Sequence, residues 1–356
     1  RLFLLGNYLN LIEEFILKAF DNTDINFVDK KWLENQIHNF YNPSAEPEQL
    51  PTDFIAYLDK YLELKKNDIT KNTIKKVNVI KQLILRYIDH TKKRLSITDI
   101  NADFKVSFEN YCLENNYAPN TIGIAFKFIK TICNHAKSNG LETSNQLSNI
   151  KSKQVAVDNI YLTFEDLEKV EKAKVKSYNI HYEDAKDWLI ISCYIGQRIS
   201  DFMRLTEKNI RIEKGKHLLE FKQVKTGKLM TVPLHPKVLE ILKKRNGKFP
   251  EPIVDQKYNL YIKEVCRIAK INDIVPGSLK VEITPESKIY RKETGNYEKW
   301  KLVSSHIGRR SFATNFYGTI PTTYLIYVTG HSTEQMFLTY IGKSNKDIAM
   351  ELTNYF

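Results

Sequence analysis

The chain has 356 residues with 42% hydrophobic and 12% aromatic side chains, which is enough for two or three domains with buried cores. It contains no run of about 18 or more apolar residues, which excludes an ordinary membrane-spanning helix. The net charge of +12 favours a polyanionic partner such as nucleic acid, although many basic proteins bind none.

Residues 1–51 form an acidic N-terminal region. They carry four basic and eight acidic side chains, a net charge of −4, so the remaining 305 residues carry +16. The spacing of apolar residues predicts one or two amphipathic helices within residues 1–40. The loop "NPSAEPEQLP" at 42–51 has three prolines among polar residues and is predicted to be a linker.

Residues 52–147 are predicted to form a small all-helical domain. Four segments have helical character: "TDFIAYLDKYLELKKN", "ITKNTIKKVNVIKQLILRYIDHT", "NADFKVSFENYCLENN" and "APNTIGIAFKFIKTICNHAKSNG". The first should place its apolar side chains roughly on one face: Phe54, Ile55, Leu58, Leu62 and Leu64. Gly140 follows the last segment in a good position to end a helix, and the polar segment 148–159 is predicted to be a second linker.

Two of these helices begin with an Asn-Thr pair followed by lysines, in "TKNTIKK" and "APNTIGIAFKFIK". We expect Asn72 or Thr73 to start the first of them. Free backbone N–H groups and the helix dipole at such an end suit a phosphate, although simple capping explains the pair equally well. The nearby lysines favour DNA contact, and the candidate residues are Lys71, Asn72, Thr73, Lys75, Lys76, Asn120, Thr121, Lys127 and Lys130.

Residues 160–356 are predicted to form a second, mixed domain. Helices within "YLTFEDLEKVEKAKV", "EDAKDWLIISCYIG" and "QRISDFMRL" precede two strands, "KHLLEFKQV" and "KLMTVPL". Two further helices follow, then an irregular hairpin over 272–303 and a last helical group from "SHIGRRSFATNFY". The expected fold is therefore mainly α, with a small antiparallel β-sheet in this domain.

Six residues of this second domain attract attention by their order. Each alone fits a structural role, since an arginine at a helix break is often a cap and a turn lysine is usually solvated. A tyrosine, one of 20 in the chain, is usually a packing residue. The set comprises an arginine between two helices, a lysine at a β-turn, an H-x-x-R pair on one helix face, and a histidine nine residues before a tyrosine: Arg198, Lys225, His306, Arg309, His331 and Tyr340.

In this order and spacing, the six residues resemble the tyrosine recombinase (phage integrase) family. "IGQRISDFMRL" is similar to its first-arginine box, "VKTGKLMTVPL" to its lysine-bearing hairpin, "HIGRRSFATNF" to its second-arginine box and "GHSTEQMFLTY" to the box that ends in the nucleophile. The resemblance covers about residues 52–350. It implies a core DNA-binding domain at 52–147 and a catalytic domain at 160–356, and residues 1–51 could be the remnant of an arm-binding region. Gly308 and Arg310 depart from the usual Leu and His of the second-arginine box.

The resemblance implies the activity of a mobile-element integrase, which cleaves and rejoins DNA through a covalent 3′-phosphotyrosine without metal, nucleotide or other cofactor. Tyr340 would be the nucleophile, His306 would assist its deprotonation and Lys225 would protonate the leaving oxygen. The phosphate would be held by Arg198, Arg309 and His331, and we expect Asp201 to orient Arg198. Two alternatives remain open: a phosphotyrosine-type topoisomerase, and a non-catalytic DNA-binding regulator derived from an integrase.

The family further implies double-stranded DNA recombination sites as the partner, a homotetramer on DNA, and accessory DNA-bending or excision factors. After the tyrosine, Ile348 and Leu352 could pack on one helix face, and cis and trans docking both remain open. The four cysteines have no metal-ligand spacing and indicate buried thiols in a reducing compartment: Cys112, Cys133, Cys193 and Cys266. We expect a cytoplasmic, nucleoid-associated protein with no metal site and no membrane contact.

Overall fold

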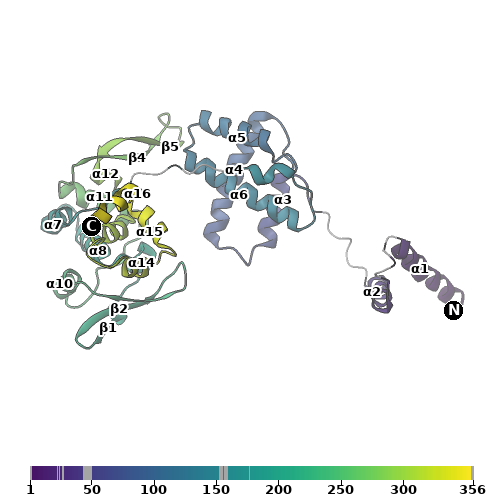
Figure 1. Ribbon diagram of the computed structural model, residues 1–356, viewed down its shortest axis with the longest axis horizontal. Helices are drawn as coiled ribbons and strands as arrows, with labels where there is room; N and C mark the ends of the chain where they lie inside the picture. The colour runs from purple at the N-terminus through teal and green to yellow at the C-terminus, as the bar shows by residue number, and fades with distance from the viewer. Residues whose placement is uncertain are drawn as a thin grey trace. The chain divides into compact units, whose positions relative to one another are not determined.

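A computed structural model describes residues 2–21, 23, 25, 28–42, 50–151, 155, 159–175 and 177–353. The chain divides into two compact units, Arg1–Gln154 and Val155–Phe356, and it is mainly helical with small antiparallel sheets, as predicted (Figure 1). Residues 43–49, 152–154 and 156–158, which make up most of the two predicted linkers, lie outside the described residues. None of the described helices is both long and apolar enough to span a bilayer.

The N-terminal region contains two helices, α1 (Leu2–Asp21) and α2 (Lys30–Tyr41). Asp29 begins α2 because its carboxylate accepts a hydrogen bond from the backbone N–H of Trp32. The helices contact each other through aromatic side chains, with ring centroids 5.6 Å apart for Phe15 and Phe40. No residue of α2 is fully buried, so this pair of helices has very little core.

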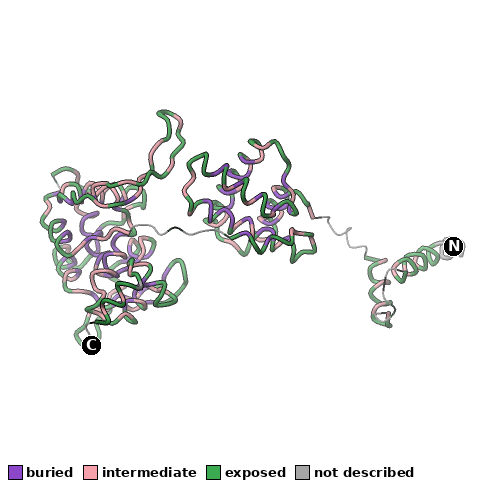
Figure 2. Tube along the Cα trace, turned by 45° about the horizontal axis from the view of Figure 1, so that its top comes forward, coloured by how far each residue is buried: buried purple, intermediate pink, exposed green. Residues whose placement is uncertain are grey.

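Four helices and a short 3₁₀ helix enclose the core of the helical domain: α3 (Phe54–Leu64), α4 (Lys71–Thr91), α5 (Ala102–Glu114), α6 (Pro119–Ser138) and Asn145–Asn149. Figure 2 shows this core as buried chain inside exposed helix faces. The predicted apolar face of α3 is correct for Phe54 and Leu58, which are buried, but Leu64 is 49% exposed at the C-terminal end.

The two helix starts differ from the prediction. Thr70, and not Asn72 or Thr73, caps α4, because its hydroxyl accepts a hydrogen bond from the backbone N–H of Thr73. The cap position of α6 is Ala118, which offers no side-chain acceptor, and Pro119 occupies the first helical position. Both Asn-Thr pairs therefore lie within the first helical turn and do not cap their helices.

The second unit begins with α7 (Phe164–Lys172), α8 (His181–Ile195) and α9 (Ile199–Phe202). An antiparallel sheet of order β1-β2-β3 follows, formed by β1 (Ile210–Glu213), β2 (Lys216–Lys222) and β3 (Leu229–Pro233). The later elements are α10 (Pro236–Lys244), α11 (Asp255–Ile268), β4 (Ile274–Glu282), β5 (Tyr290–Glu298), α12 (Lys299–Leu302), α13 (Ile307–Asn315), α14 (Thr322–Thr329), α15 (Glu334–Ile341) and α16 (Asn345–Leu352).

Two strand predictions need correction. The sheet has a third strand, β1, whose short polar sequence "IRIE" gives no clear alternation and whose pairing with β2 supplies its order. The predicted irregular hairpin is a regular one, since β4 and β5 pair without interruption from Ile274 opposite Glu298 to Glu282 opposite Tyr290. A strand of this kind is stabilised by its partner more than by its own sequence.

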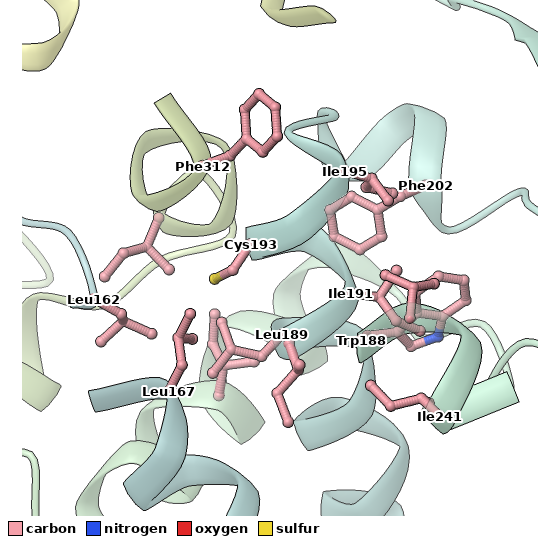
Figure 3. Packing of buried hydrophobic residues seen from close by; sticks show 14 of the residues in the cluster. Leu162, Leu167, Trp188, Leu189, Ile191, Cys193, Ile195, Phe202, Ile241 and Phe312 are labelled. Atoms are coloured by element: carbon pink, nitrogen blue, oxygen red, sulfur yellow. The ribbon is translucent and has the colours of Figure 1, made fainter. Parts of the chain in front are cut away.

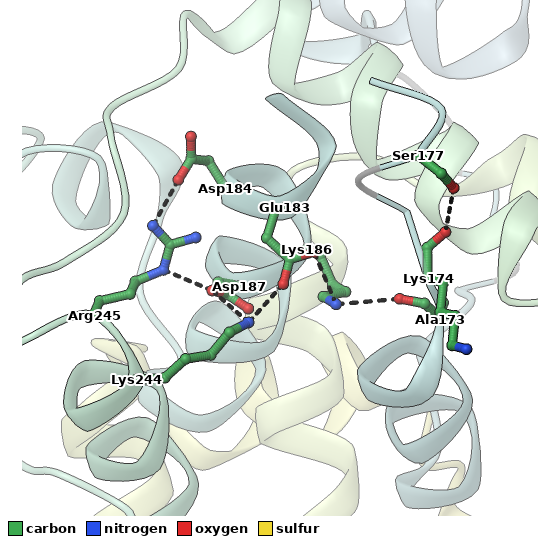
Figure 4. Close-up of polar contacts among 9 residues, drawn as sticks. All are labelled: Ala173, Lys174, Ser177, Glu183, Asp184, Lys186, Asp187, Lys244 and Arg245. Atoms are coloured by element: carbon green, nitrogen blue, oxygen red, sulfur yellow. Dashed lines mark hydrogen bonds and ion pairs between the residues drawn. The ribbon is translucent and has the colours of Figure 1, made fainter. Parts of the chain in front are cut away.

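Helix α8 runs through the centre of the hydrophobic core of the second unit (Figure 3), and ten of its residues are buried. Trp188 stacks on Phe249 with centroids 5.6 Å apart and donates a hydrogen bond to the carbonyl of Glu251. On its polar face, Arg245 just after α10 bonds Asp187 at 2.6 Å and Asp184 at 2.7 Å, which joins α10 to α8 (Figure 4). The helix is thereby held firmly, and it forms the base of the site described next.

Helix α13 packs tightly against α8 at Gly308. A Cβ atom added to Gly308 would lie 1.9 Å from Oγ of Ser192 and 2.6 Å from its Cβ. A leucine, the residue usual at this position of the second-arginine box, would not fit against α8 here. This close contact places α13, which carries several of the predicted site residues, directly against the end of α8.

Candidate active site

Arg198 lies where α8 ends and α9 begins, as predicted. Helix α8 ends at Gly196, whose φ of +66° is a left-handed conformation, and a Cβ there would lie 2.6 Å from Cδ1 of Phe312. Arg198 is the residue immediately before α9 and is half-buried. Its Nη1 atom is buried without a hydrogen-bond partner among the described residues.

Arg309 lies in the first turn of α13 and is only 1% exposed. Its Nη1 donates a hydrogen bond of 3.0 Å to the carbonyl of Gly196, which joins α13 to the end of α8. Its Nη2 is buried and has no hydrogen-bond partner among the described residues. Burial, followed by the charge of Arg198, lowers the pKa of Arg309 to about 10, so the two guanidinium groups lie close enough to repel each other.

Tyr340 lies in the last turn of α15, and its hydroxyl is 3.0 Å from Nε2 of His306 in the same chain. The Tyr340 ring centroid is 4.8 Å from that of His331 and 5.5 Å from that of His306. The structure therefore brings the predicted nucleophile to the two histidines and, through His306, to the start of α13. Burial raises the pKa of Tyr340, and the charges of Arg309, Arg310 and Arg198 oppose that rise.

The hydrogen bond between His331 and Thr329 determines the tautomer of the histidine. The Thr329 hydroxyl donates its single hydrogen to the carbonyl of Leu325 at 2.5 Å, and the same oxygen lies 2.9 Å from Nδ1 of His331. Nδ1 must therefore be the donor in that contact. A neutral His331 then carries no hydrogen on Nε2, the other ring nitrogen.

Both histidines are neutral near pH 7. Loss of water around the ring, then the charges of Arg310, Arg309 and Arg198, lower the pKa of His306 to about 4, although part of the residue stays exposed. Burial and the charges of Arg309 and Arg198 lower the pKa of His331 to about 4 as well. The site is thus a cluster of cationic arginines around uncharged rings, which suits a bound anion.

Lys225 is separate from the other five residues. It is exposed in the turn between β2 and β3, where the backbone N–H of Gly227 donates to the carbonyl of Gln223 at 2.9 Å. Within the described part of the chain, no hydrogen bond, ion pair or ring contact joins Lys225 to any of them. The structure therefore brings five predicted residues together and leaves the sixth on a neighbouring hairpin.

Asp201 does not have the predicted role. Its Oδ1 accepts a hydrogen bond of 2.8 Å from the backbone N–H of Val224, and its Oδ2 is buried without a partner. The backbone N–H of Asp201 donates to the carbonyl of Arg198 at 2.8 Å, but no hydrogen bond joins the Asp201 carboxylate to the Arg198 guanidinium in the described residues, because the carboxylate faces the β2–β3 turn. Asp201 therefore anchors the backbone next to Lys225 and does not orient the arginine.

Arg310 also lies at the site, although the sequence marked it only as a departure from the usual His of the second-arginine box. Its Cζ lies 5.6 Å from the ring centroid of Tyr340, and its Nη1 donates to the carbonyl of Ile160 at 3.3 Å. Its Nε is buried without a partner in the described chain. The only sequence signal was its position beside Arg309, which does not tell which way a helical side chain points.

The nine candidate DNA contacts of the helical domain fall into two groups. Lys71, Lys75, Lys76 and Lys127 are exposed, and no ion pair holds them in the described residues. The other group contains residues that are partly buried or bonded: Lys130 donates to the carbonyl of Ser148 at 3.1 Å, and the hydroxyl of Thr73 lies 3.1 Å from that of Thr70. Asn72 and Thr121 are exposed like the four lysines, and the half-buried Asn120 belongs to the second group.

Helix α16, which follows Tyr340, packs against the core of the second unit of its own chain. Ile348 packs against the core, while Leu352 is exposed. Glu351 accepts hydrogen bonds from Lys343 at 2.5 Å and from the hydroxyl of Tyr317 at 2.9 Å. The predicted apolar face of this segment is therefore correct for Ile348 only, and in this structure the contact is made in cis.

Metal-binding groups and thiols contribute nothing visible to this site. In the part of the chain that the structure describes, no group of three or more His, Cys, Asp or Glu side chains could hold a metal ion. All four cysteines are free and buried, and burial raises the pKa of Cys133 and of Cys193 to about 12. Such thiols are unreactive packing residues.

Comparison with known proteins agrees with this arrangement. The model of the phage integrase SAM-like domain matches residues 53–153, and that of the phage integrase family matches residues 160–347. No curated protein matches the chain significantly.

Several solved structures share the fold. A lambda integrase dimer bound to a COC′ core site is 17% identical, with a TM-score of 0.57, over 79% of this chain and 96% of that one. The Tn1549 transposon integrase in complex with transposon right-end DNA is 14% identical, with a TM-score of 0.59, over 85% and 99%. A lambda integrase tetramer bound to a Holliday junction is 15% identical, with a TM-score of 0.56, over 87% and 88%. At identities this low, the likeness shows the fold alone. The family match covers more than half of the chain, and the protein therefore belongs to the phage integrase family of tyrosine-type site-specific DNA recombinases.

Proposed function

We propose that this recombinase cleaves and rejoins DNA through a covalent 3′-phosphotyrosine formed at Tyr340, within the active site of the same chain. The observation that carries the proposal is the 3.0 Å contact between the Tyr340 hydroxyl and Nε2 of a neutral His306, next to two arginines whose buried donors have no partner among the described residues. In this proposal residues 160–356 are the catalytic domain, and residues 52–147 are the core DNA-binding domain.

The unpaired arginine donors supply the site for the scissile phosphate. Among the described residues, Nη1 of Arg198 and Nη2 of Arg309 are buried, charged and without hydrogen-bond partners, an arrangement that is unfavourable unless an anion completes it. Two non-bridging phosphate oxygens would accept hydrogen bonds from these groups. The same donors would hold the negative charge that develops at phosphorus, where loss of one donor typically lowers the rate by about 10² to 10³.

Cleavage then requires two proton movements. His306 accepts the proton of Tyr340 at Nε2 while the phenolic oxygen forms its bond to phosphorus. The bond between phosphorus and the 5′ oxygen breaks, and Lys225 donates a proton to that oxygen. The energy of the phosphodiester is retained in the phosphotyrosine, so a 5′ hydroxyl of another strand can reseal the break by the reverse steps. Neither a metal ion nor a nucleotide takes part in these steps.

We assign His331 to the phosphate as a third donor. A neutral His331 has no hydrogen on Nε2, because Nδ1 donates to Thr329. To donate from Nε2 the ring must take up a proton. The charge of a bound phosphate favours that uptake, since a nearby anion raises the pKa of an imidazole.

The DNA contacts of the helical domain are part of the same proposal. We propose that the four exposed lysines, Lys71, Lys75, Lys76 and Lys127, contact the DNA backbone from the first turns of α4 and the face of α6. The DNA-bound lambda and Tn1549 integrases and the lambda integrase tetramer on a Holliday junction support double-stranded recombination sites as substrate and a homotetramer as the working form.

A nicked suicide substrate tests this function, because cleavage near the nick releases a short strand and traps the covalent adduct. We expect Tyr340→Phe to bind the DNA and form no adduct, while Tyr324→Phe, on the exposed side of α14, forms adduct like the wild type. An adduct that persists in Tyr340→Phe would overturn the assignment. Supercoil relaxation without strand exchange between two sites would instead indicate a topoisomerase.

A further inference from the structure

Two buried glutamines lie beside the residues of the proposed chemistry, and no step of the mechanism uses them. Gln197 precedes Arg198 and has no exposed surface, and Gln223 lies two residues before Lys225 and is 2% exposed. Buried amides need hydrogen-bond partners for all of their polar atoms, so their contacts specify how the chain around them is held.

The hydrogen bonds of these amides run in one direction. Nε2 of Gln197 donates to the carbonyls of Ile195 and Val328, at 2.9 Å each, which uses both of its hydrogens. Its Oε1 must then accept, and Nε2 of Gln223 donates to it at 3.4 Å. Oε1 of Gln223 is left to accept from the hydroxyl of Thr226 at 2.7 Å.

This chain of bonds joins three segments that carry site residues. Ile195 and Gln197 belong to the segment before Arg198, and Gln223 and Thr226 lie on either side of Lys225. The third segment is the end of α14, because Val328 precedes His331 and a Cβ placed on Gly330 would lie 3.6 Å from Nε2 of Gln223.

Other hydrogen bonds also stabilise the β2–β3 turn, but several of them lie within the turn itself. The backbone N–H of Gln223 donates to the carbonyl of Lys228 at 2.9 Å, which closes the turn on itself. The hydroxyl of Thr226 also accepts from the N–H of Lys228 at 3.4 Å. These bonds shape the turn without relating it to the rest of the site. Among the described residues, the Asp201–Val224 bond and the glutamine chain are the only hydrogen bonds that connect the turn to the arginine segment, and Nζ of Lys228 lies 4.9 Å from the ring centroid of Tyr327 on α14.

We propose that Gln197, Gln223 and Thr226 form a positioning clamp. The clamp holds the turn that carries Lys225 in a fixed position relative to Arg198 and the end of α14. Lys225 is exposed, and no hydrogen bond or ion pair within the described residues holds its ammonium group, so the position of that group depends on the turn that carries it. The clamp would deliver this group to the leaving 5′ oxygen of a phosphate held by the arginines. The inference rests on the proposed role of Lys225 as the general acid.

The test compares two leaving groups in single-turnover cleavage of the nicked substrate. In one substrate the leaving atom is the natural 5′ oxygen, and in the other it is sulfur at the same bridging position. A thiol has a pKa of about 8.5, so sulfur departs as a thiolate and needs no proton. A defect in proton delivery therefore disappears on the sulfur substrate, whereas a defect in phosphate binding or folding remains on both.

Thr226→Val and Thr226→Ser form a matched pair, because serine keeps the hydroxyl and valine does not. Thr226 lies on an exposed turn. We expect Thr226→Val to be about tenfold slower on the oxygen substrate, the scale of a small misplacement of a reacting group, and within about twofold of wild type on the sulfur substrate. Thr226→Ser should match the wild type on both. Gln223→Met should behave like Thr226→Val, and exposed Gln256→Met serves as the control for a glutamine replacement.

Lys225→Ala is the reference for a lost proton donor, with an expected loss of about 10² or more on oxygen and recovery on sulfur. If Lys225→Ala recovers and Thr226→Val is equally slow on both substrates, the clamp is only structural and the inference fails. A Thr226→Val rate equal to that of the wild type on oxygen also overturns it. If Lys225→Ala does not recover, the proposed role of Lys225 fails, while the Tyr340→Phe test of the proposed function is decided separately. Should Gln223→Met fail to fold, the Thr226 pair still decides.

Discussion

Replacing Arg309 by methionine should stabilise the protein while it abolishes activity. Arg309 is 1% exposed, lies near the charge of Arg198 and has one buried nitrogen without a partner. Burial and this neighbour lower its pKa to about 10, which makes the charged form less favourable in the folded state than in the unfolded state. A tenfold change in the acid dissociation constant corresponds to about 1.4 kcal/mol, so the charge on Arg309 lowers the free energy of unfolding by about 3 kcal/mol.

The pH range of this effect follows from its sign. The arginine is charged in both states below about pH 10, so the loss is fully present and constant near pH 7 and disappears only as the pH rises through and above the folded pKa. Methionine has a similar length and no charge, but it removes the bond from the charged guanidinium to Gly196, worth about 1.5 kcal/mol. The net expectation is a gain of about 1.5 kcal/mol.

Thermal unfolding without DNA measures this gain. For a unit of about 200 residues, a gain of about 1.5 kcal/mol raises Tm by about 3–6 °C. Arg267→Met is the control, since Arg267 is exposed and paired with Glu264, and it should change stability by less than about 0.5 kcal/mol. Cleavage by Arg309→Met should fall by about 10² to 10³. A Tm of Arg309→Met equal to or below that of the wild type would refute the inference that the buried charge of Arg309 destabilises the folded protein.

Three further predictions follow from the same site. Gly308→Ala should lower stability by about 1–3 kcal/mol, because its Cβ would lie 1.9 Å from Oγ of Ser192, and Ser192→Gly in the same chain should recover part of the lost Tm. Because Tyr340 meets His306 of its own chain, mixing Tyr340→Phe with Arg309→Met should yield no adduct, and an adduct in that mixture would show cleavage in trans. In the DNA-free protein the pKa of His306 is about 4, so an NMR titration should find the His306 ring neutral between about pH 8 and about pH 6. A titration midpoint near pH 6.5 would mean that His306 titrates as an ordinary histidine.

Local features of the fold and of the site were predictable from the sequence. The helical periods of 52–147 predict the four helices, and the H-x-x-R spacing places His306 and Arg309 one turn apart. The strand β1 and the cap of α4 were missed. A short polar strand is stabilised mainly by its partner, and Thr70 competes with two other good capping residues within three positions.

The sequence by itself determined which chemical groups are available and in what order, because motifs and helix spacing are local properties of the chain. Only the tertiary structure decided which atoms meet. It directs Asp201 to Val224 and places Arg310 against Tyr340, and it ties Lys130 to a carbonyl. These contacts join segments far apart in the chain, and they depend on how α8, α13, α15 and the β2–β3 turn pack. The close approach at Gly308 and the buried glutamines result from that packing, which no local pattern records.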